Sequence, residues 1–386
     1  MLNSGQSYIK HIPANRIIAS VESGNLKATI DFQLISETDA VLIAVPTPLT
    51  AHHEPDMSYI ISTAEIIAPY IHPNQLIVLE STTYPGTTEG ILRDILEEGS
   101  GLKAGKDFLL AFSPEREDPN NEEYNTATIP KVVGGMDANS LSAALAIYGE
   151  IIVRTIPVSS CAAAESTKLL ENIFRAVNIA MVNELKMIFH KMDIDIWEVI
   201  DAAKSKPFGF MPFYPGPGLG GHCIPIDPFY LTWKALEFGQ NTRFIELAGE
   251  INEAMPDYVV QRTLEELNEI GQCLKGRKLL LVGMAYKGDI DDMRESPTLK
   301  LFDLFTGKGA RVSYYDPFIP VIPKTREYSH LAGIKSISLE EVDKFDVVVI
   351  STKHSTVDHR IFADRCPLVI DTRKAIAENL PNVHRA

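Results

Sequence analysis

The chain has 386 residues, enough for two or three domains with sizeable apolar cores. Apolar residues make up 45% and charged residues 23%, as in an ordinary soluble globular protein. The net charge of −15 argues against nucleic acid as the main partner, because such partners require a basic face. No apolar run approaches the roughly 18 residues of a membrane span, so we expect no membrane partner.

Four cysteines lie singly in the sequence, at positions 161, 223, 273 and 366. No two of them form a CxxC pair, so neither a zinc ribbon nor a dithiol redox motif is predicted, and we expect no metal. Free thiols are typical of a reducing compartment, and the first residues lack the pattern of a signal peptide. We therefore expect a cytoplasmic location.

Short apolar runs alternate with helical patterns through the first 150 residues. Strands are predicted at 39–46, 75–81, 108–113 and 131–135, and helices at 57–71, 88–98 and 138–149. This alternation is typical of a parallel sheet with helical crossovers. Because such sheets bind ligands beyond the carboxyl ends of their strands, the loops 46–48, 81–88 and 113–119 are expected to share one edge.

A long helix is predicted at 162–192, where the sequence contains neither glycine nor proline. At 1.5 Å per residue it would be on the order of 45 Å long. Lys168 and Asn172 are four residues apart, so both would project from one face. Such a helix could join two sheet domains and form the contact of a homodimer. The plainer alternative for Lys168 is a solvated surface lysine.

The segment 215–228 reads PGPGLGGHCIPIDP, with four glycines and four prolines around Cys223. We expect it to be a loop throughout, because proline lacks a backbone donor and glycine costs backbone entropy. A thiol in such a loop, with Asp227 four residues later, is a candidate nucleophile. An inert buried thiol is the alternative. A thiol hydrolase using His222 is less favoured, because neighbouring loop residues usually point apart.

A second set of strands and helices fills the rest of the chain. Helices are predicted at 229–237, 243–254, 256–270 and 297–306, and strands at 277–283, 310–317, 346–352 and 368–372. The expected fold is therefore α/β, with two Rossmann-like parallel-sheet domains joined by the long helix. The predicted domains are 1–157 with the first sheet, 158–255 as a central helical and dimerisation domain that contains the Cys223 segment, and 256–386 with the second sheet.

Four motifs resemble the nucleotide-sugar 6-dehydrogenase family, which acts on UDP-glucose, GDP-mannose and related sugars. They are STTYPGTT at 81–88, KLLEN at 168–172, GPGLGGHCIPIDP at 216–228 and GMAYKGDIDDMRES at 283–296. They occur in the family's order and span nearly the whole chain. The resemblance implies that the domain 1–157 binds NAD and that the domain 256–386 binds UDP. The segments at 206–216, 229–233 and 242–250 look most like the branch that oxidises UDP-N-acetylglucosamine. The UDP-N-acetylmannosamine and UDP-glucose branches are the alternatives.

The resemblance implies a four-electron oxidation that turns the C6 alcohol of a UDP-sugar into a carboxylate, with NAD as cofactor. Cys223 would capture the aldehyde as a thiohemiacetal, which is oxidised to a thioester and then hydrolysed. A thiolate adds readily to an aldehyde, and the covalent bond keeps the reactive intermediate on the enzyme.

The resemblance also implies roles for other residues of this sequence. Lys168 and Asn172 would stabilise an oxyanion, and Asp227 would orient Lys168 or a water. Thr82 and Glu115 would position water or take part in acid–base steps. The implied NAD contacts are Thr47, Thr82 and Arg294. The implied substrate contacts are Glu115, Lys168, Asn172, Phe213, Tyr214, Pro215, Gly216, Gly220 and Lys287.

Two features of the sequence depart from the family. Members open with a strand, a GxGxxG turn and an acidic residue after the second strand, about 30 residues in all, and this sequence begins in the loop that follows. We therefore expect an incomplete N-terminal sheet with an exposed edge and weaker NAD binding. A catalytically dead remnant that still binds a UDP-sugar is the alternative. The family's second acid could correspond to Glu117 or Asp118.

Overall fold

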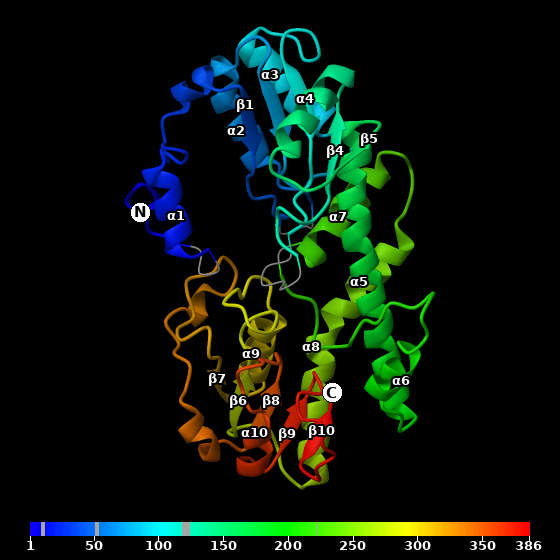
Figure 1. The fold of residues 1–386 in the computed structure, drawn as a ribbon. Coiled ribbons are helices and arrows are strands. Elements are labelled where there is room, and N and C mark those ends of the chain that lie inside the picture. Colours follow the sequence, from blue (N-terminus) through cyan, green and yellow to red (C-terminus); the bar gives the residue numbers. More distant parts are fainter. Residues whose placement is uncertain (9–11, 51–53, 118–123, 222) are drawn as a thin grey trace. The chain divides into compact units, whose positions relative to one another are not determined.

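The computed structural model describes residues 1–8, 12–50, 54–117, 124–221 and 223–386. Contacts divide the chain into two compact units, Met1–Leu170 and Glu171–Ala386. Each unit contains one five-stranded sheet, so the predicted α/β class with two mostly parallel sheets is confirmed (Figure 1). The boundaries predicted for three domains, at 157 and 255, stay a prediction.

The sheet of the first unit has the strand order β1-β2-β3-β4-β5. The strands are β1 (Ala40–Ile43), β2 (Leu76–Leu79), β3 (Leu109–Phe112), β4 (Lys131–Gly135) and β5 (Thr155–Val158). The first four lie where the apolar runs predicted them. The sequence did not predict β5, which is short and contains Pro157, a residue typical of edge strands.

The predicted all-parallel sheet is wrong at one pair, because β4 runs antiparallel to β3. A parallel pair needs a crossover that carries the chain back to the other end of the sheet. The described residues between the two strands, 113–117 and 124–130, form no helix that could do this. As a result Lys131, the first residue of β4, lies at the edge where β2 and β3 end.

Helices cover both faces of this sheet. They are α2 (Ser58–Ile67), α3 (Arg93–Ser100) and α4 (Ala138–Gly149), with a π-helical turn at Thr88–Leu92 before α3. The helix α1 (Ala14–Glu22) packs instead beside the 3-10 turn Leu2–Ser4. Alternate strand residues face opposite sides, as the pleat requires. Ile77 and Leu110 pack with α2 and α3, whereas Val78 and Ala111 pack against α4.

The helix α5 (Cys161–Lys191) begins in the first unit and ends in the second, within a residue of its predicted bounds. The second unit continues with α6 (Ile196–Ala203), α7 (Cys223–Leu236) and α8 (Arg243–Glu269). None of the helices in the described part of the chain is both long and apolar enough to cross a membrane.

Two predictions about proline are wrong in this unit. The segment 215–228 is not a loop throughout, because α7 starts at Cys223 and contains Pro228. Pro225 lies in the first turn, where a helix does not need the backbone N–H. The two helices expected on either side of Pro256 form the single helix α8. Pro256 is itself buried there, so packing offsets the hydrogen bond that it removes.

The sheet of the second unit has the order β10-β9-β8-β6-β7, and all its pairs are parallel. Its strands are β6 (Lys278–Val282), β7 (Arg311–Tyr315), β8 (Val347–Ile350), β9 (Val369–Asp371) and β10 (Val383–Arg385), with α9 (Pro297–Gly307) and α10 (Arg360–Arg365) beside them. The Ser296 hydroxyl accepts from Thr298 N–H, and Pro297 follows it, so α9 begins with a favourable cap.

Candidate active site

The loops that follow β1, β2 and β3 leave the same edge of the first sheet, as predicted, because these three strands are parallel neighbours. The backbone N–H of Val45 donates to the Ser81 hydroxyl over 2.7 Å, which joins two of the loops. Thr47 is buried, Thr82 is half-buried and Glu115 is exposed. The structure thus brings these three predicted residues to one edge.

A buried lysine lies beside Glu115 at this edge. The Lys131 ammonium is 3.1 Å from Glu80 Oε1 and 3.6 Å from Glu115 Oε2. The Tyr148 hydroxyl donates to Glu80 Oε1 over 2.6 Å. Burial and the Glu80 carboxylate raise the pKa of Tyr148, so the phenol keeps its proton and remains a donor.

A second buried carboxylate, Glu165 on α5, holds the loop that contains Thr82. Its Oε2 accepts from Gly86 N–H over 2.6 Å, and its Oε1 accepts from the N–H and hydroxyl of Thr88 over 2.9 and 2.7 Å. Burial raises the pKa of Glu165, although these hydrogen bonds act in the opposite direction. The carboxylate therefore anchors the start of the helical turn that precedes α3.

Lys168 and Asn172 follow on the same face of α5. Lys168 is 8% exposed and Asn172 3%, so Lys168 is not the solvated surface lysine of the alternative interpretation. Asn172 Nδ2 donates to Asp227 Oδ2 over 2.5 Å, and Asp227 is buried within α7. The predicted residues Asn172 and Asp227 are thus in direct contact.

The glycine segment before α7 is held at Gly216 by three groups. Gly216 N–H donates to Asn183 Oδ1 over 2.9 Å, and its carbonyl accepts from the Lys186 ammonium over 3.1 Å. A Cβ at this position would lie 2.3 Å from Nη1 of Arg373. Only glycine fits such a close approach. At Gly220, a Cβ would lie 2.5 Å from Cβ of Tyr286.

Of the two cations beside Gly216, Lys186 is buried and Arg373 is half-buried. Burial lowers the pKa of Lys186, and the nearby Arg373 charge lowers it further. Burial also lowers the pKa of Arg373 to about 10. The sequence reasoning missed Lys186 and Asn183. Their spacing from Asn172, by 14 and 11 residues, places them on the same helical face and was a usable signal.

The remaining predicted residues make other contacts. Phe213 packs edge-on against Phe174, with ring centroids 5.6 Å apart. The exposed Tyr214 donates its hydroxyl to Asp201 over 3.0 Å. Lys287 is exposed, as is Arg294, whose guanidinium pairs with Asp292 over 2.6 Å. Their predicted contacts with phosphate or NAD stay predictions.

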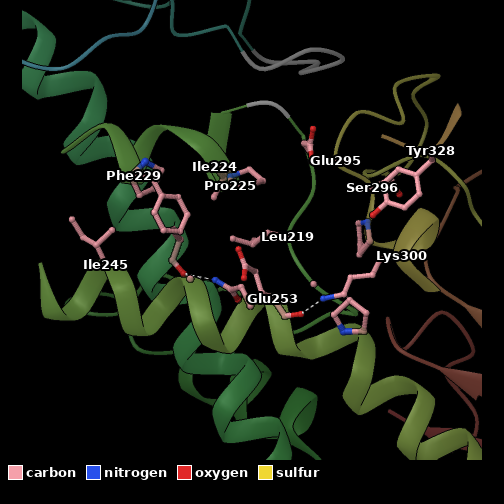
Figure 2. A pocket seen from close by; sticks show the side chains of 17 residues that line it. Leu219, Ile224, Pro225, Phe229, Ile245, Glu253, Glu295, Ser296, Lys300 and Tyr328 are labelled. Carbon is pink, nitrogen blue, oxygen red and sulfur yellow. Dashed lines mark hydrogen bonds between the residues drawn. The ribbon is translucent and has the colours of Figure 1, made fainter. Parts of the chain in front are cut away.

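A cavity of about 170 Å³ lies between α7, α8 and the start of α9 (Figure 2). Its lining is mostly apolar, and the Lys300 ammonium donates to the Glu253 carbonyl over 2.8 Å at one side. Gly218 and Leu219 border it, but the described residues that line it include none of the predicted site residues. Ile224, Pro225 and Pro228 also line it, and they are sequence neighbours of Cys223 and Asp227.

Two predicted positions and one predicted side chain fall outside the described part of the structure. His222 and Asp118 are not described, nor is the side chain of Cys223. The Cys223 backbone is the first residue of α7. Glu117 is exposed, and its N–H donates to Glu115 Oε1 over 2.8 Å.

Three models of one family match successive parts of the chain. For the UDP-glucose/GDP-mannose dehydrogenase family, the NAD binding domain matches residues 1–152, the central domain 162–254 and the UDP binding domain 280–378. These matches together include most strands of both sheets and most of the helices, so the class of protein is a nucleotide-sugar dehydrogenase.

Individual proteins agree with this class. Protein CapL of Staphylococcus aureus is 33% identical over 94% of this chain and 86% of its own length. A UDP-N-acetyl-D-glucosamine 6-dehydrogenase of Pseudomonas aeruginosa is 32% identical over 86% of this chain and 78% of its own length. A solved UDP-D-ManNAc dehydrogenase of Pyrococcus horikoshii superposes with a TM-score of 0.89 at 30% identity, covering 100% of this chain and 89% of that one.

The chain belongs to the UDP-glucose/GDP-mannose dehydrogenase family. It is an oxidoreductase of the NAD-dependent UDP-sugar 6-dehydrogenases, and its cofactor is NAD.

The edge of the first sheet fits NAD in part. Thr47, Ser81 and Thr82 lie in loops beyond parallel strands, where such sheets bind nucleotides. The described loops after β1, β2 and β3 contain no GxGxxG turn for a pyrophosphate. The one stretch that matches this pattern, at 216–221, follows no strand and lies in the second unit. We therefore assign no pyrophosphate contact.

Proposed function

We propose that this chain oxidises the C6 alcohol of UDP-N-acetylglucosamine to the carboxylate, through a covalent bond to Cys223. The observation that carries the proposal is the buried hydrogen bond between Asn172 of α5 and Asp227, four residues after Cys223. A buried carboxylate is costly unless it is hydrogen-bonded, so its presence here supports a site rather than simple packing. The Pseudomonas relative, 32% identical, carries this activity in its name.

The cysteine would act as the nucleophile. The backbone of α7 begins at Cys223, and the amino end of a helix stabilises negative charge, which supports a thiolate at this position. Bound NAD would accept the hydrides that the sugar loses. The side chains of this chain would bind the sugar, hold the aldehyde on sulfur and direct water to the thioester.

Lys168 and Asn172 would stabilise the oxygen of the thiohemiacetal. They lie one helical turn apart on α5, and Asp227 fixes the Asn172 amide so that its other hydrogen is free to point elsewhere. Preorganised donors of this kind lower the energy of developing negative charge without rearranging during the reaction. Thr82 and Glu115, from the edge of the first sheet, would position the water that hydrolyses the thioester.

The substrate would be held by the segment 211–220 together with Lys287. Within it Phe213, Tyr214 and Pro215 would contact the sugar, and the glycines Gly216 and Gly220 would allow close approach of the backbone. Their fixed surroundings support this role. For NAD, the proposed contacts are Thr47, Thr82 and Arg294.

UDP-N-acetylmannosamine is the second candidate substrate. The Pyrococcus structure with a TM-score of 0.89 is titled as a dehydrogenase of that sugar. The two sugars differ at C2, away from the reacting carbon, so the catalytic residues would serve either one.

We also propose a homodimer through α5. Four large apolar side chains on this helix are at least 45% exposed, and their spacing of four, seven and seven residues forms one stripe: Leu170, Phe174, Met181 and Ile188. An apolar stripe of this kind usually marks an interface. A role in making precursors of surface polysaccharides would follow from the uronate product.

The test is NADH production with UDP-N-acetylglucosamine, UDP-N-acetylmannosamine and UDP-glucose, for the parent and for Cys223→Ser. We expect two NADH per uronate in the parent, the highest kcat/KM with the first sugar, and no uronate from the variant. Full turnover by Cys223→Ser would contradict the covalent route. Calorimetric binding of a UDP-sugar without any NADH would instead support the inactive remnant.

A further inference from the structure

We propose that Lys131 is a positioning residue that fixes Glu115 as a hydrogen-bond acceptor at the reaction edge of the first sheet. The inference rests on the proposed function, in which Glu115 orients the water that hydrolyses the thioester. It adds Lys131, with its supports Glu80 and Tyr148, to the residues that the reaction requires.

The topology places this lysine where it can act. In a parallel β4 the first residue would lie at the opposite end of the sheet from the loops that follow β2 and β3. Because β4 is antiparallel to β3, Lys131 begins its strand beside the end of β3. Glu80 directly follows β2, and Glu115 lies three residues after β3. Three adjacent strands therefore contribute one charged group each.

The contacts show that Glu80 anchors the lysine. The Lys131 side chain is 8% exposed, and that of Glu80 is 16% exposed, at 3.1 Å from the ammonium. The Tyr148 hydroxyl donates to the same Glu80 oxygen over 2.6 Å, while its ring lies 5.0 Å from the ammonium. A cation held by a carboxylate and an aromatic face has little freedom to move.

Glu115 is the second carboxylate that faces the Lys131 ammonium. Its side chain is 49% exposed, and its Oε2 lies 3.6 Å from Lys131. Its Oε1 accepts from the backbone N–H groups of Arg116 and Glu117 over 2.7 and 2.8 Å. Among the described residues, the groups that contact this carboxylate are therefore an ammonium and two backbone N–H donors. A water bound to its exposed lone pairs would have to donate a hydrogen, which leaves the water oxygen free to attack.

A purely structural ion pair would be the alternative. One lysine facing two carboxylates leaves one negative charge in excess, and Glu80 alone would neutralise the buried cation. Stability therefore requires the Glu80 contact but not the Glu115 contact. The two interpretations differ in whether removing Lys131 affects the reaction through Glu115.

The test is a double-mutant cycle on turnover, with Lys131→Met, Glu115→Gln and the double variant. We expect each single variant to lower kcat by about tenfold or more, within the range for lost acid–base positioning, while KM for the UDP-sugar changes by less than about twofold. In the Glu115→Gln background, Lys131→Met should cause almost no further loss of kcat. Lys131→Arg should restore most of the activity, because it restores the cation.

A matched control is Lys103→Met, which removes a lysine from an ion pair with Glu97 in the same unit, where the lysine side chain is 65% exposed. It should leave kcat unchanged. If Lys131→Met does not fold, Tyr148→Phe keeps the inference testable, since it removes only the hydroxyl that fixes Glu80. Its smaller loss of kcat should also vanish in the Glu115→Gln background.

The outcomes separate this inference from the proposed function. No uronate from the parent would overturn both. Turnover in the parent, with losses from Lys131→Met and Glu115→Gln that multiply independently, would overturn the positioning role alone. Thermal unfolding of the same variants supplies a readout without turnover, in which Lys131→Met should lower Tm in both backgrounds because Glu80 loses its partner in each.

Discussion

Removing the Glu165 carboxylate should destabilise the first unit and loosen the loop that contains Thr82. Three donors depend on this side chain, namely Gly86 N–H and the N–H and hydroxyl of Thr88. Glu165 is fully buried, so Glu165→Ala leaves these donors inside the protein without their carboxylate acceptor. Each unpaired donor costs about 1–3 kcal/mol, and the relief of a buried charge offsets part of the sum.

The net loss of unfolding free energy for Glu165→Ala should therefore be about 3 kcal/mol. For a unit of this size that corresponds to roughly 6–12 °C in Tm. Glu165→Gln should cost less, about 1–2 kcal/mol, because its amide oxygen can still accept from Thr88 while its NH2 group faces Gly86 N–H.

The difference in unfolding free energy between the parent and Glu165→Gln should depend on pH. Burial raises the pKa of Glu165 above its usual 4.5, so the folded state binds this proton more tightly than the unfolded state. The stability from this group is fully present below pH 4.5 and is lost as pH rises through the folded-state pKa. Glutamine does not titrate, so the advantage of the parent should narrow over that window.

Denaturant unfolding, followed by far-UV circular dichroism at several pH values, measures the loss of unfolding free energy in each variant and its dependence on pH. Asp94→Asn is the control, because Asp94 lies at the start of α3 with a side chain that is 65% exposed. It should change the unfolding free energy by no more than about 0.5 kcal/mol. The reasoning would be refuted if Glu165→Ala changed the unfolding free energy as little as this control. It would also be refuted if the stability advantage of the parent over Glu165→Gln grew as pH rises.

Three further predictions concern the second unit and the long helix. The pKa of Lys186 is lowered by burial, so the unfolding free energy should rise as pH rises toward the lysine's usual 10.5, and calorimetry on Lys186→Met should show this rise removed. Gly216→Ala should raise KM for the UDP-sugar in steady-state assays and lower Tm in thermal melts, because the added Cβ would meet Arg373. Gly149→Ala, which has open space around the added Cβ, should change neither quantity. Met181→Glu places a charge on the exposed stripe of α5 and should convert the proposed dimer to a monomer in light scattering; an unchanged mass would exclude that interface.

Much of the fold could be predicted because the apolar runs are short and well separated. Four strands of each sheet lie within the predicted ranges, and α5 follows from a stretch without glycine or proline. The direction of β4 could not be predicted, since strand polarity depends on the connection rather than on the strand's own residues. Pro228 and Pro256 misled the helix boundaries, because local proline rules do not include the packing that offsets a lost hydrogen bond.

The sequence predicted site residues that lie close together in the chain or match a motif. It did not predict residues whose hydrogen-bond or ion-pair partners lie far away in the sequence. Asn172 and Asp227 come from motifs, and their contact is observed. Glu165 was missed because its hydrogen-bond donors lie 77 and 79 residues away in the sequence. Lys131 was missed because Glu80, its ion-pair partner, lies 51 residues away. A buried charge looks like a surface charge in sequence until its partners are known.

One face of α5 carries buried polar side chains that hydrogen-bond to segments distant in the sequence. Five buried polar residues occupy it at intervals of three, four, eleven and three, which keep a single helical face: Glu165, Lys168, Asn172, Asn183 and Lys186. An ordinary core helix would present apolar side chains there. Instead Glu165 holds the loop after β2, Asn172 holds α7, and the last two hold Gly216. Glu165 therefore makes its contacts within the first unit, and Asn172, Asn183 and Lys186 make theirs within the second.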